Sequence, residues 1–417
     1  MTLRRRQFLK MMGGGVAAAS VSRRAWGAAK GPVRVGFIAP LSGPFAQNGR
    51  DMWDGFRLYF EEIGFQAAGR TIEVLSEDSW VEPAEALTKL RKLVEKDRVH
   101  VASGGLLGPT PFALQGYVTS QNLPFVLAML AADDLTQRKI VPWFVRVGWT
   151  ASQPTQPFAE YCYKTLGYRR VAGLNFDFAF GYETFGGFHR VFEDLGGKVV
   201  QKLWVPAAVA DFAPYLAVVK RDIDALFAAF TGAPALRFLR QAVEYGLKGK
   251  MAIIGTGILT DEHILPSMGD EALGVVTALH YSAALDSPAN KRFRSAYEKL
   301  AGRVPSYYAA ISYTSARWIV EALKAVAGDI ENREQYLAAL KKVEVTDDPR
   351  GPIKIDAWGN PIQNIYVRKV ERVGGQLQNS VIHTYSNVSQ FWTYRPEEFL
   401  RNPVYDREKF PGCRFCE

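Results

Sequence analysis

Apolar strands alternate with amphipathic helices along the first third of the chain, and this alternation limits the possible folds more than any other feature. The helix expected over residues 51–62 places Met52, Phe56, Tyr59 and Phe60 on one side. Strands and a second helix surround it, at residues 33–40, 71–78, 83–96 (the helix), 99–105, 123–129 and 143–148. Such alternation predicts a parallel sheet with helices on both faces.

The same scheme returns in the second half of the chain. Strands are expected at 169–177, 198–205, 224–230, 250–257 and 274–281, with helices at 182–195 and around 236–247. A chain of 417 residues with 48% hydrophobic residues exceeds the size at which one core usually divides, so two lobes are expected. The predicted fold class is α/β, with two doubly wound parallel-sheet lobes. Later helices at 288–301 and 311–327 and a hairpin at 351–370 are too small to form a domain, so each is expected to return to a lobe.

Residues 1–29 have the order of an export signal: positive charge, a short apolar stretch, then small residues at Gly27, Ala28 and Ala29. Arg5 and Arg6 precede Gln-Phe-Leu-Lys, which resembles a twin-arginine signal. The alternative is a charged, frayed N-terminus. Cleavage after Ala29 would remove six positive residues and no acidic one, so the net charge falls from +9 to +3. The mature protein is therefore expected in the periplasm, without a membrane span or a nucleic-acid partner.

The chain has three cysteines, and two of them, Cys413 and Cys416, form a C-x-x-C pair near its end. In an oxidising compartment this pair could close a small disulfide, although the same spacing occurs in redox and metal sites. The five histidines are scattered singly, so neither a metal nor a cofactor is expected. The role of the aromatic-rich tail at 385–417 stays open between a segment wrapped on a lobe and a mobile one.

The first predicted strand runs into a glycine-containing turn, "VGFIAPLSGPFAQNG" at 35–49, that carries no acid, base, thiol or imidazole. In open α/β sheets, ligands bind beyond the carboxyl ends of the strands, where loops and helix N-termini present backbone N–H groups. The turn therefore indicates ligand binding without catalysis.

Several segments, taken in order, resemble the type I periplasmic solute-binding proteins of ABC importers, specifically the branched-chain amino-acid-binding (leucine-binding) family. They include "VGFIAPLSGPFAQNGRDMWDGFRL", "SEDSWVEPAEALTKLRKLV", "FVRVGWTASQ", "NFDFAFGYETFGGF" and "FLRQAVEYGLKGKMAIIGTG". The resemblance covers about residues 33–370. It implies two lobes that close on a ligand about a hinge, a monomeric state and a membrane permease as partner.

The resemblance also implies three crossovers between the lobes, near Gly148-Trp149, near Tyr281-Ser282 and around 347–351. The expected parts are lobe 1 from residues 30–148 and 282–346, lobe 2 from 149–281 and a hairpin at 347–384, and the tail at 385–417.

The chain departs from the amino-acid-binding pattern at three positions. Leu130-Ala131 stands where such relatives hold the ligand carboxylate with hydroxyl and small residues, and Phe180 replaces a tyrosine. Gly257 stands where they keep the acid that pairs the ligand ammonium. Because burying an unpaired ammonium costs several kcal/mol, the pocket is expected to reject amino acids. The alternative is an acid supplied from elsewhere, such as Asp133 or Asp177.

The remaining residues of the expected cleft are mostly apolar, which suits a small apolar or aromatic carboxylate. Phe178 and Phe230 also belong to this apolar set, in which aromatic residues at strand ends are the preferred candidates. The predicted ligand-binding residues are Phe45, Asn48, Gly108, Thr110, Met129, Leu130, Ala131, Trp149, Phe180, Thr231, Thr256 and Gly257. The ring is expected between Phe180 and the 129–131 loop, and the carboxylate near Gly108, Thr110 and Asn48.

An enzyme is the alternative class. The chain has no G-x-S-x-G elbow, H-E-x-x-H helix, Walker loop or G-x-G-x-x-G after a strand, so no catalytic site is predicted. A ligand sensor that docks on a membrane receptor shares the fold, and the sequence does not separate it from an importer component.

Overall fold

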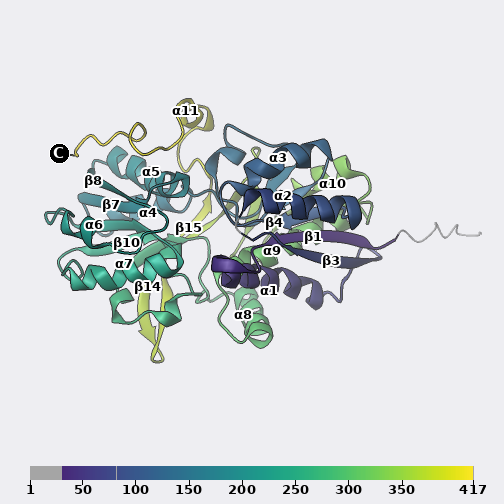
Figure 1. Ribbon diagram of the computed structural model, residues 1–417, viewed down its shortest axis with the longest axis horizontal. Coiled ribbons are helices and arrows are strands. Elements are labelled where there is room, and N and C mark those ends of the chain that lie inside the picture. The colour runs from purple at the N-terminus through teal and green to yellow at the C-terminus, as the bar shows by residue number, and fades with distance from the viewer. Residues whose placement is uncertain (1–30, 81, 417) are drawn as a thin grey trace, which may run out of the picture. The chain divides into compact units, whose positions relative to one another are not determined.

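The first sheet contains β1 (Val33–Ala39), β2 (Gln66–Ala67), β3 (Arg70–Asp78), β4 (Val101–Gly104), β5 (Phe125–Leu127) and β6 (Phe144–Arg146). Its strand order is β2-β3-β1-β4-β5-β6, and all pairs but β2–β3 are parallel. The computed structural model describes residues 31–80 and 82–416, so the predicted leader lies outside the described residues. From Pro32 onward the chain forms one compact unit that holds two lobes (Figure 1).

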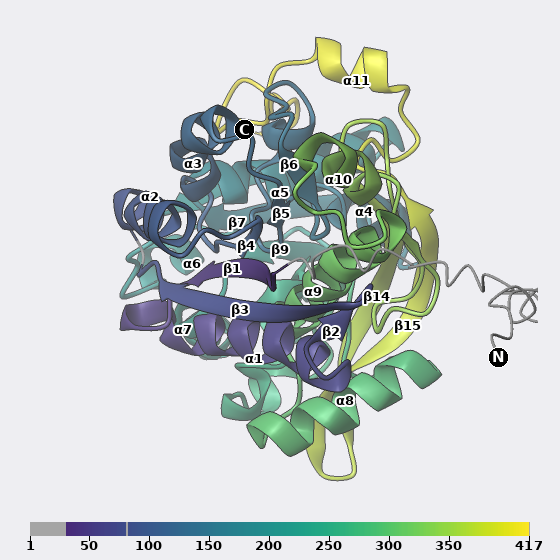
Figure 2. The same cartoon turned by 90° about the vertical axis from the view of Figure 1, so that its right-hand side faces the viewer.

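Two layers of helices cover the first sheet and complete lobe 1 (Figure 2). Met52, Phe56, Tyr59 and Phe60 are all buried, which confirms the predicted amphipathic helix. The helices are α1 (Ala46–Glu62), α2 (Pro83–Arg91), α3 (Thr110–Ser120), α8 (Pro288–Ala301), α9 (Tyr307–Ala325) and α10 (Arg333–Leu340). Helices α1 and α9 share one core with β1, and α2 and α3 form a separate core on the other face.

The second sheet belongs to lobe 2 and ends in a long antiparallel ribbon. Its strands are β7 (Arg170–Phe176), β8 (Lys198–Val205), β9 (Ala225–Ala229), β10 (Ala252–Thr256), β11 (Val276–Leu279), β12 (Glu344–Val345), β13 (Ile353–Ile355), β14 (Pro361–Val373) and β15 (Gln376–Val388). The order is β12-β13-β14-β11-β10-β9-β7-β8, with β15 paired to β14. The second expected lobe is confirmed.

Helices pack on both faces of the parallel part of this sheet. They are α4 (Thr155–Lys164), α5 (Ala179–Asp194), α6 (Ala213–Ala217) and α7 (Gly232–Glu244). Helices α4 and α5 share a core with β7 and β9, whereas α6 and α7 form a second core with Phe230 and Phe238. Phe230 therefore lies inside lobe 2.

The chain passes between the lobes three times, and β12, which falls in the expected lobe 1 return at 282–346, pairs with β13 in the second sheet instead. The path leaves lobe 1 after Arg146 and returns from lobe 2 after Leu279. The third passage centres on Arg350, a fully buried residue that contacts three segments. Its guanidinium donates to Thr314 Oγ1 of α9 at 3.2 Å, to Gln363 Oε1 of β14 at 2.9 Å and to the Val147 carbonyl at 2.8 Å. This residue ties the crossovers together.

The C-terminal segment wraps over both lobes, which is the first of the two alternatives that the sequence left open for the tail. It begins after Val388 rather than at 385, because β15 pairs with β14 through that residue. Gln390 exchanges hydrogen bonds with Thr136 of lobe 1, and the Arg138 guanidinium donates to the Asn402 carbonyl at 2.8 Å. On lobe 2, the Arg190 guanidinium lies 3.9 Å from the Tyr394 ring centre.

The end of this segment carries a disulfide between Cys413 and Cys416, which is one of the alternatives left open by the sequence. Cys162, in contrast, is buried and unpaired. A short helix, α11 (Pro396–Arg401), lies between the strand and this disulfide. Over residues 31–80 and 82–416, no helix is long and apolar enough to cross a membrane.

Candidate functional site

Aromatic side chains from both lobes and from the first crossover meet at the junction between the sheets. The ring of Trp149 lies 6.1 Å from that of Phe180, at the start of α5, and 6.3 Å from that of Tyr307, at the start of α9. Phe180 is half-buried and packs against the cores of both lobes. The rings of Tyr307 and Tyr308 are tilted by 39° to one another, with centres 4.0 Å apart. We call Trp149, Phe180, Tyr307 and Tyr308 the aromatic cluster.

Tyr308 is the point at which predicted residues of the two lobes approach one another. Its hydroxyl lies near the side chains of Asn48 in α1 and Thr231 at the end of β9. Burial and the charge of Asp261 raise the pKa of Tyr308 to about 12, so the phenol is neutral. The cluster therefore joins lobe 1 and lobe 2 through uncharged groups.

Several polar atoms around this cluster are buried and make no hydrogen bond with any described residue. They are Trp149 Nε1 and both ring nitrogens of His280, and Thr256 Oγ1 at the end of β10 has no such bond either. Because buried polar groups are nearly always paired, atoms without protein partners indicate a place for water or a ligand. Most of these residues follow the carboxyl ends of parallel strands, where ligands of α/β proteins bind.

Gly257 has a structural reason to lack a side chain. A Cβ atom there would lie 2.4 Å from Leu279 Cβ and 2.6 Å from Nη2 of Arg368. Arg368 is fully buried, and its guanidinium donates to the Gly257 carbonyl at 2.5 Å and to the Tyr281 carbonyl at 2.8 Å. The space that an acidic side chain would need is thus filled by Arg368 and Leu279.

The acids weighed as replacements are engaged elsewhere. Asp177 accepts from Tyr182 at 2.5 Å and from Arg407 at 2.6 Å. Asp133 accepts from the Ser152 backbone at 3.3 Å, and its own N–H donates to Glu183. Both oxygens of Asp177 therefore have partners, whereas Oδ2 of Asp133 makes no hydrogen bond with a described residue.

Another acid, Asp261, lies closer to the aromatic cluster. Its carboxylate contacts His263 Nδ1 at 2.6 Å and accepts from the Tyr307 backbone N–H at 3.4 Å. Burial alone would raise the pKa of Asp261, but the hydrogen bond and charge of His263 and the charge of Arg368 hold it below its usual value. The pKa of His263 is raised in turn, against the effect of burial, by Asp261. The carboxylate is thus ionised and paired.

The predicted lobe 1 residues fall in different surroundings. Asn48 and Thr110 are buried in the first turns of α1 and α3, Phe45 is half-buried before α1, and Gly108 is exposed. Met129 and Ala131 lie in the core that also contains Trp149 and Tyr307.

Leu130 lies elsewhere, in the separate core of α2 and α3, where its side chain packs over Gly105. In lobe 2, Phe178 is 41% exposed, unlike Phe180. The structure brings Asn48, Trp149, Phe180 and Thr231 to the junction. That the predicted residues contact a ligand stays a prediction for all of them.

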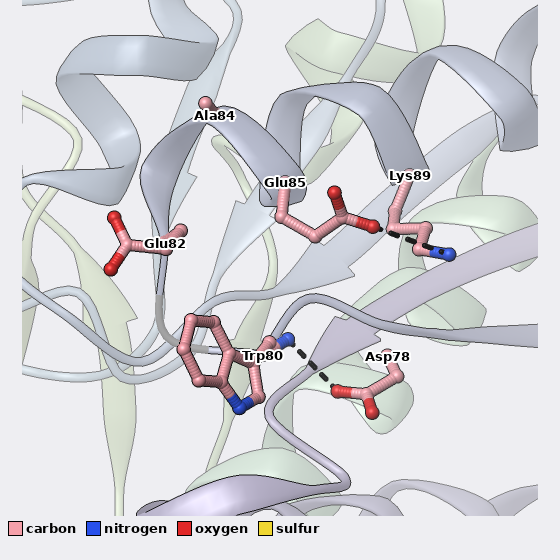
Figure 3. Close-up of a pocket in the computed structure, with 6 residues that line it drawn as sticks. All are labelled: Asp78, Trp80, Glu82, Ala84, Glu85 and Lys89. Carbon is pink, nitrogen blue, oxygen red and sulfur yellow. Dashed lines mark hydrogen bonds and ion pairs between the residues drawn. The ribbon is translucent and has the colours of Figure 1, made fainter.

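A separate surface hollow of about 500 Å³ opens beside the first predicted loop (Figure 3). Its lining residues are Asp78, Trp80, Glu82, Ala84, Glu85 and Lys89. Trp80 lies over Gly43, where an added Cβ would come within 2.3 Å of the indole nitrogen. Because three carboxylates and one ammonium line this hollow, it does not suit an anionic ligand. The junction between the lobes is the better candidate.

Sequence reasoning missed His280, Tyr307, Tyr308, Asp261 and Arg368. His280 follows β11, so the rule that ligands bind beyond parallel strand ends could have found it. The two tyrosines begin α9, which was expected to start only at residue 311. Across the described residues, no group of three or more His, Cys, Asp or Glu side chains could hold a metal ion.

Comparison with known proteins gives consistent matches over nearly all of the chain beyond the predicted leader. A Leu/Ile/Val-binding protein homolog 6 from Brucella melitensis biotype 1 is 31% identical over 361 residues, which are 85% of this chain and 91% of that protein. Among solved structures, an ABC transporter substrate-binding protein from Sphaerobacter thermophilus has a TM-score of 0.83 at 34% identity, covering 86% of this chain and 99% of its own.

A second solved structure was determined with a ligand. It is a solute-binding protein of an ABC transporter from Rhodopseudomonas palustris BisB5 in complex with 3,4-dihydroxybenzoic acid. Its TM-score is 0.81 at 34% identity, and the match covers 86% of this chain and 98% of that chain. Residues 32–376 match the family model of the periplasmic binding proteins. This chain, with its two lobes of parallel-dominated sheets, therefore belongs to the periplasmic binding protein family.

Proposed function

We propose that this chain is the extracytoplasmic substrate-binding component of an ABC importer and captures a small aromatic or apolar carboxylic acid between its lobes. Family membership and the solved relative with 3,4-dihydroxybenzoic acid support this proposal. The observation that carries it is the aromatic cluster between the lobes, and it is supported by the filled side-chain space at Gly257, where the resemblance places the acid of amino-acid-binding relatives. A mostly apolar wall with a few polar groups suits such a ligand.

The same geometry argues against a zwitterionic amino acid. An ammonium group buried in the cluster would need an ionised partner, and leaving it unpaired costs several kcal/mol. The side-chain space at Gly257 is filled, and the carboxylates of Asp177 and Asp261 are paired with other residues. An aromatic carboxylate needs no such partner, because its ring packs against Trp149, Phe180 and Tyr307.

Binding would close the two lobes about the three crossovers, as hinge motions do in proteins of this class. The closed form would then dock on the membrane permease, and the protein would act as a monomer without a nucleic-acid partner. We expect no catalysis. A ligand recovered after long incubation with stoichiometric protein should be chemically unchanged, and a product formed only with folded protein would overturn this.

We also propose that the protein reaches the periplasm by the twin-arginine route. Arg5 and Arg6 lie outside the described residues, so this proposal rests on the sequence alone. Replacing both by Lys should leave precursor in the cytoplasm. Mature protein outside the cytoplasm in that variant would contradict the proposed route without affecting the proposed ligand.

A thermal-shift panel tests the ligand class. The full chain, unfolded and refolded to remove any bound solute, is heated with benzoate, 4-hydroxybenzoate, dicarboxylates, amides and leucine, isoleucine or valine in parallel. At a hundredfold excess over Kd, a ligand that binds only the folded state adds about 2.7 kcal/mol of stability. We expect this with an aromatic acid and little with the amino acids.

A pair of neighbouring phenylalanines supplies a matched control. Phe180→Ala removes a ring that packs between the lobes, so it should weaken aromatic-acid binding by at least tenfold, as truncation of a buried contact does. Phe178→Ala, two residues earlier and 41% exposed, should change it by less than about threefold. Equal losses of affinity in the two variants would mean that the ligand does not bind at the junction between the lobes.

Binding of a branched-chain amino acid or an amide is the second candidate. It is favoured by the relative named a Leu/Ile/Val-binding protein homolog and by Asp261, which contacts the backbone of Tyr307. A shift with leucine and none with aromatic acids would select it and would leave the transport role intact. A sensor role shares the same fold, and neighbouring genes for permeases and ATPases, as opposed to a kinase, would distinguish the two.

A further inference from the structure

His280 and Trp149 form a polar pair without partners at the junction of the lobes. His280 follows β11 at the second crossover, and Trp149 lies in the first. Their ring centres are 5.5 Å apart, and both side chains are buried, at 0% and 2% exposure. Tyr307 of the aromatic cluster lies 6.0 Å from the imidazole. The pair therefore borders the proposed ligand position.

None of the three nitrogen atoms in this pair makes a hydrogen bond with a described residue. Leaving one buried donor or acceptor unpaired costs about 1–3 kcal/mol. A fold gains nothing from three such atoms side by side, since an apolar ring of similar size would pack there without this cost. Their retention is explained if a bound molecule pairs with them.

The hydrogen-bonding capacity of the pair is defined. The indole Nε1–H of Trp149 can only donate. Burial, together with the nearby charges of Arg350 and Arg368, holds the pKa of His280 well below its usual value, so the imidazole is neutral. A neutral imidazole has one N–H donor and one nitrogen acceptor. The pair thus offers donors and one acceptor, but no charge.

A carboxylate is a poor match for this position. It only accepts hydrogen bonds, so the acceptor nitrogen of His280 would stay unpaired, and its charge would need a buried cation. All three guanidinium nitrogens of Arg350 already donate within the protein, as do both terminal nitrogens of Arg368, so among these donors only Arg368 Nε has no partner among the described residues. A hydroxyl both accepts and donates, so it can pair with Trp149 and His280 at once.

We propose that Trp149 and His280 recognise a hydroxyl substituent on the ring of the aromatic acid, with the carboxylate at the other end of the ligand. This rests on the proposed function and adds to it the class of ring that is preferred: phenolic acids over unsubstituted ones. Sites built to pair a hydroxyl reject the analogue that lacks it, because the buried partners are then left unpaired.

The first experiment compares three ligands on the unaltered full chain by calorimetry. 4-Hydroxybenzoate should bind at least tenfold more tightly than benzoate, the effect expected of two neutral hydrogen bonds. It should also bind more tightly than 4-methylbenzoate by a similar factor, because a methyl group fills the same space as the hydroxyl but forms no hydrogen bond. If 4-methylbenzoate binds as tightly as 4-hydroxybenzoate, the proposal is wrong, and this comparison needs no variant.

The second experiment locates the preference in the two residues. In His280→Phe and in Trp149→Phe, which keep an aromatic ring, the ratio of the two Kd values for benzoate and 4-hydroxybenzoate should fall below about threefold. The control is His189→Phe, another fully buried histidine, whose ring lies 5.8 Å from Phe185 in lobe 2. It should keep the ratio of the unaltered chain.

The outcomes separate this inference from the function on which it rests. If no aromatic acid binds, the proposed ligand class fails and this inference with it. If aromatic acids bind and the ratio is unchanged in either variant, only the inference fails. A loss of affinity for benzoate equal to that for 4-hydroxybenzoate would also overturn it, since the pair would then hold the shared carboxylate.

Discussion

Two buried polar clusters lie near the crossovers, and they differ in how far the protein satisfies them. Around Arg350, every guanidinium nitrogen donates to Thr314, Gln363 or the Val147 carbonyl. Around His280, neither ring nitrogen has a partner among the described residues, and the neighbouring Trp149 Nε1 has none. A satisfied cluster fixes the fold, whereas an unsatisfied one depends on something that binds. The comparison thus separates a residue that links segments at the crossovers from residues that we propose to bind the ligand.

Arg350→Met should have the largest effect on stability, because it breaks the satisfied cluster. The change removes hydrogen bonds to three segments and leaves the buried carboxylate of Asp348 without its neighbouring guanidinium. Removing one partner of a buried ion pair costs about 3–5 kcal/mol. Urea unfolding should show a loss of this size.

The control for this change is Arg317→Met, which breaks the pair with Asp347, the residue beside Asp348. Asp347 is 61% exposed, so this pair is accessible to solvent and its loss should cost no more than about 1 kcal/mol. Similar losses of unfolding free energy in both variants would mean that the burial and pairing of Arg350 do not explain its contribution to stability.

Gly257→Glu should come next in size. The new side chain restores the acid of amino-acid-binding relatives, but its Cβ would lie 2.4 Å from Leu279 Cβ and 2.6 Å from Arg368 Nη2. Overpacking of this kind costs about 1–3 kcal/mol. We expect a destabilised protein that still gives no thermal shift with leucine.

Gly116→Ala in α3 is the matched control, since a Cβ there meets nothing within 4 Å. It should leave stability unchanged or raise it by up to about 1 kcal/mol, because Ala is the better helix former. Strong leucine binding by the Gly257→Glu variant would contradict the packing account of this position.

Asp133 represents an intermediate case, in which a buried cluster is only partly satisfied. One carboxylate oxygen accepts from the Ser152 backbone, and the other has no hydrogen bond with a described residue. Burial raises the pKa of Asp133 from 3.8 to about 6, against the effects of Ser152 and Arg146. The folded state therefore holds this proton more tightly than the unfolded state.

It follows that the free energy of unfolding should fall as pH rises from 3.8 to about 6 and should level off above that. Asp133→Asn should flatten this part of the pH profile and add on the order of 2 kcal/mol at pH 7. Asp134→Asn, whose carboxylate accepts from Arg138 at 3.0 Å, should keep the slope. If the free energy of unfolding fell more steeply with pH in Asp133→Asn than in the unaltered chain, the pKa of Asp133 would be lowered by folding and not raised.

The fold could be predicted because its signals are local. The spacing of Met52, Phe56 and Phe60 marks a buried helix face wherever that helix packs, and alternating strands and helices leave few topologies. The inferred departure from the amino-acid-binding pattern at Gly257 also came from the order of the segments, and it stays a prediction. These inferences need no knowledge of distant contacts.

The site was predicted less completely because hydrogen-bond satisfaction is a property of the folded chain. Nothing in the sequence near Gly257 indicates that Arg368, more than a hundred residues later, fills the space beside it. In the same way, His280 looks like any isolated histidine until both ring nitrogens are found buried and unpaired. The path of the tail likewise depends on Gln390 and Arg138, which are distant in sequence.

His280→Phe should have the smallest effect on the ligand-free protein. The imidazole makes no hydrogen bond with a described residue, so its loss removes no protein contact of that kind, and the new ring can pack against Trp149 and Tyr307. Replacing an unpaired buried polar group by an apolar one of similar shape is nearly neutral or stabilising. Urea unfolding without ligand should therefore shift by less than about 1 kcal/mol, and Arg350→Met measured in parallel gives the scale. A loss of about 3 kcal/mol in His280→Phe would mean that the imidazole has a structural partner, such as an ordered water, and the contrast between the two clusters would no longer hold.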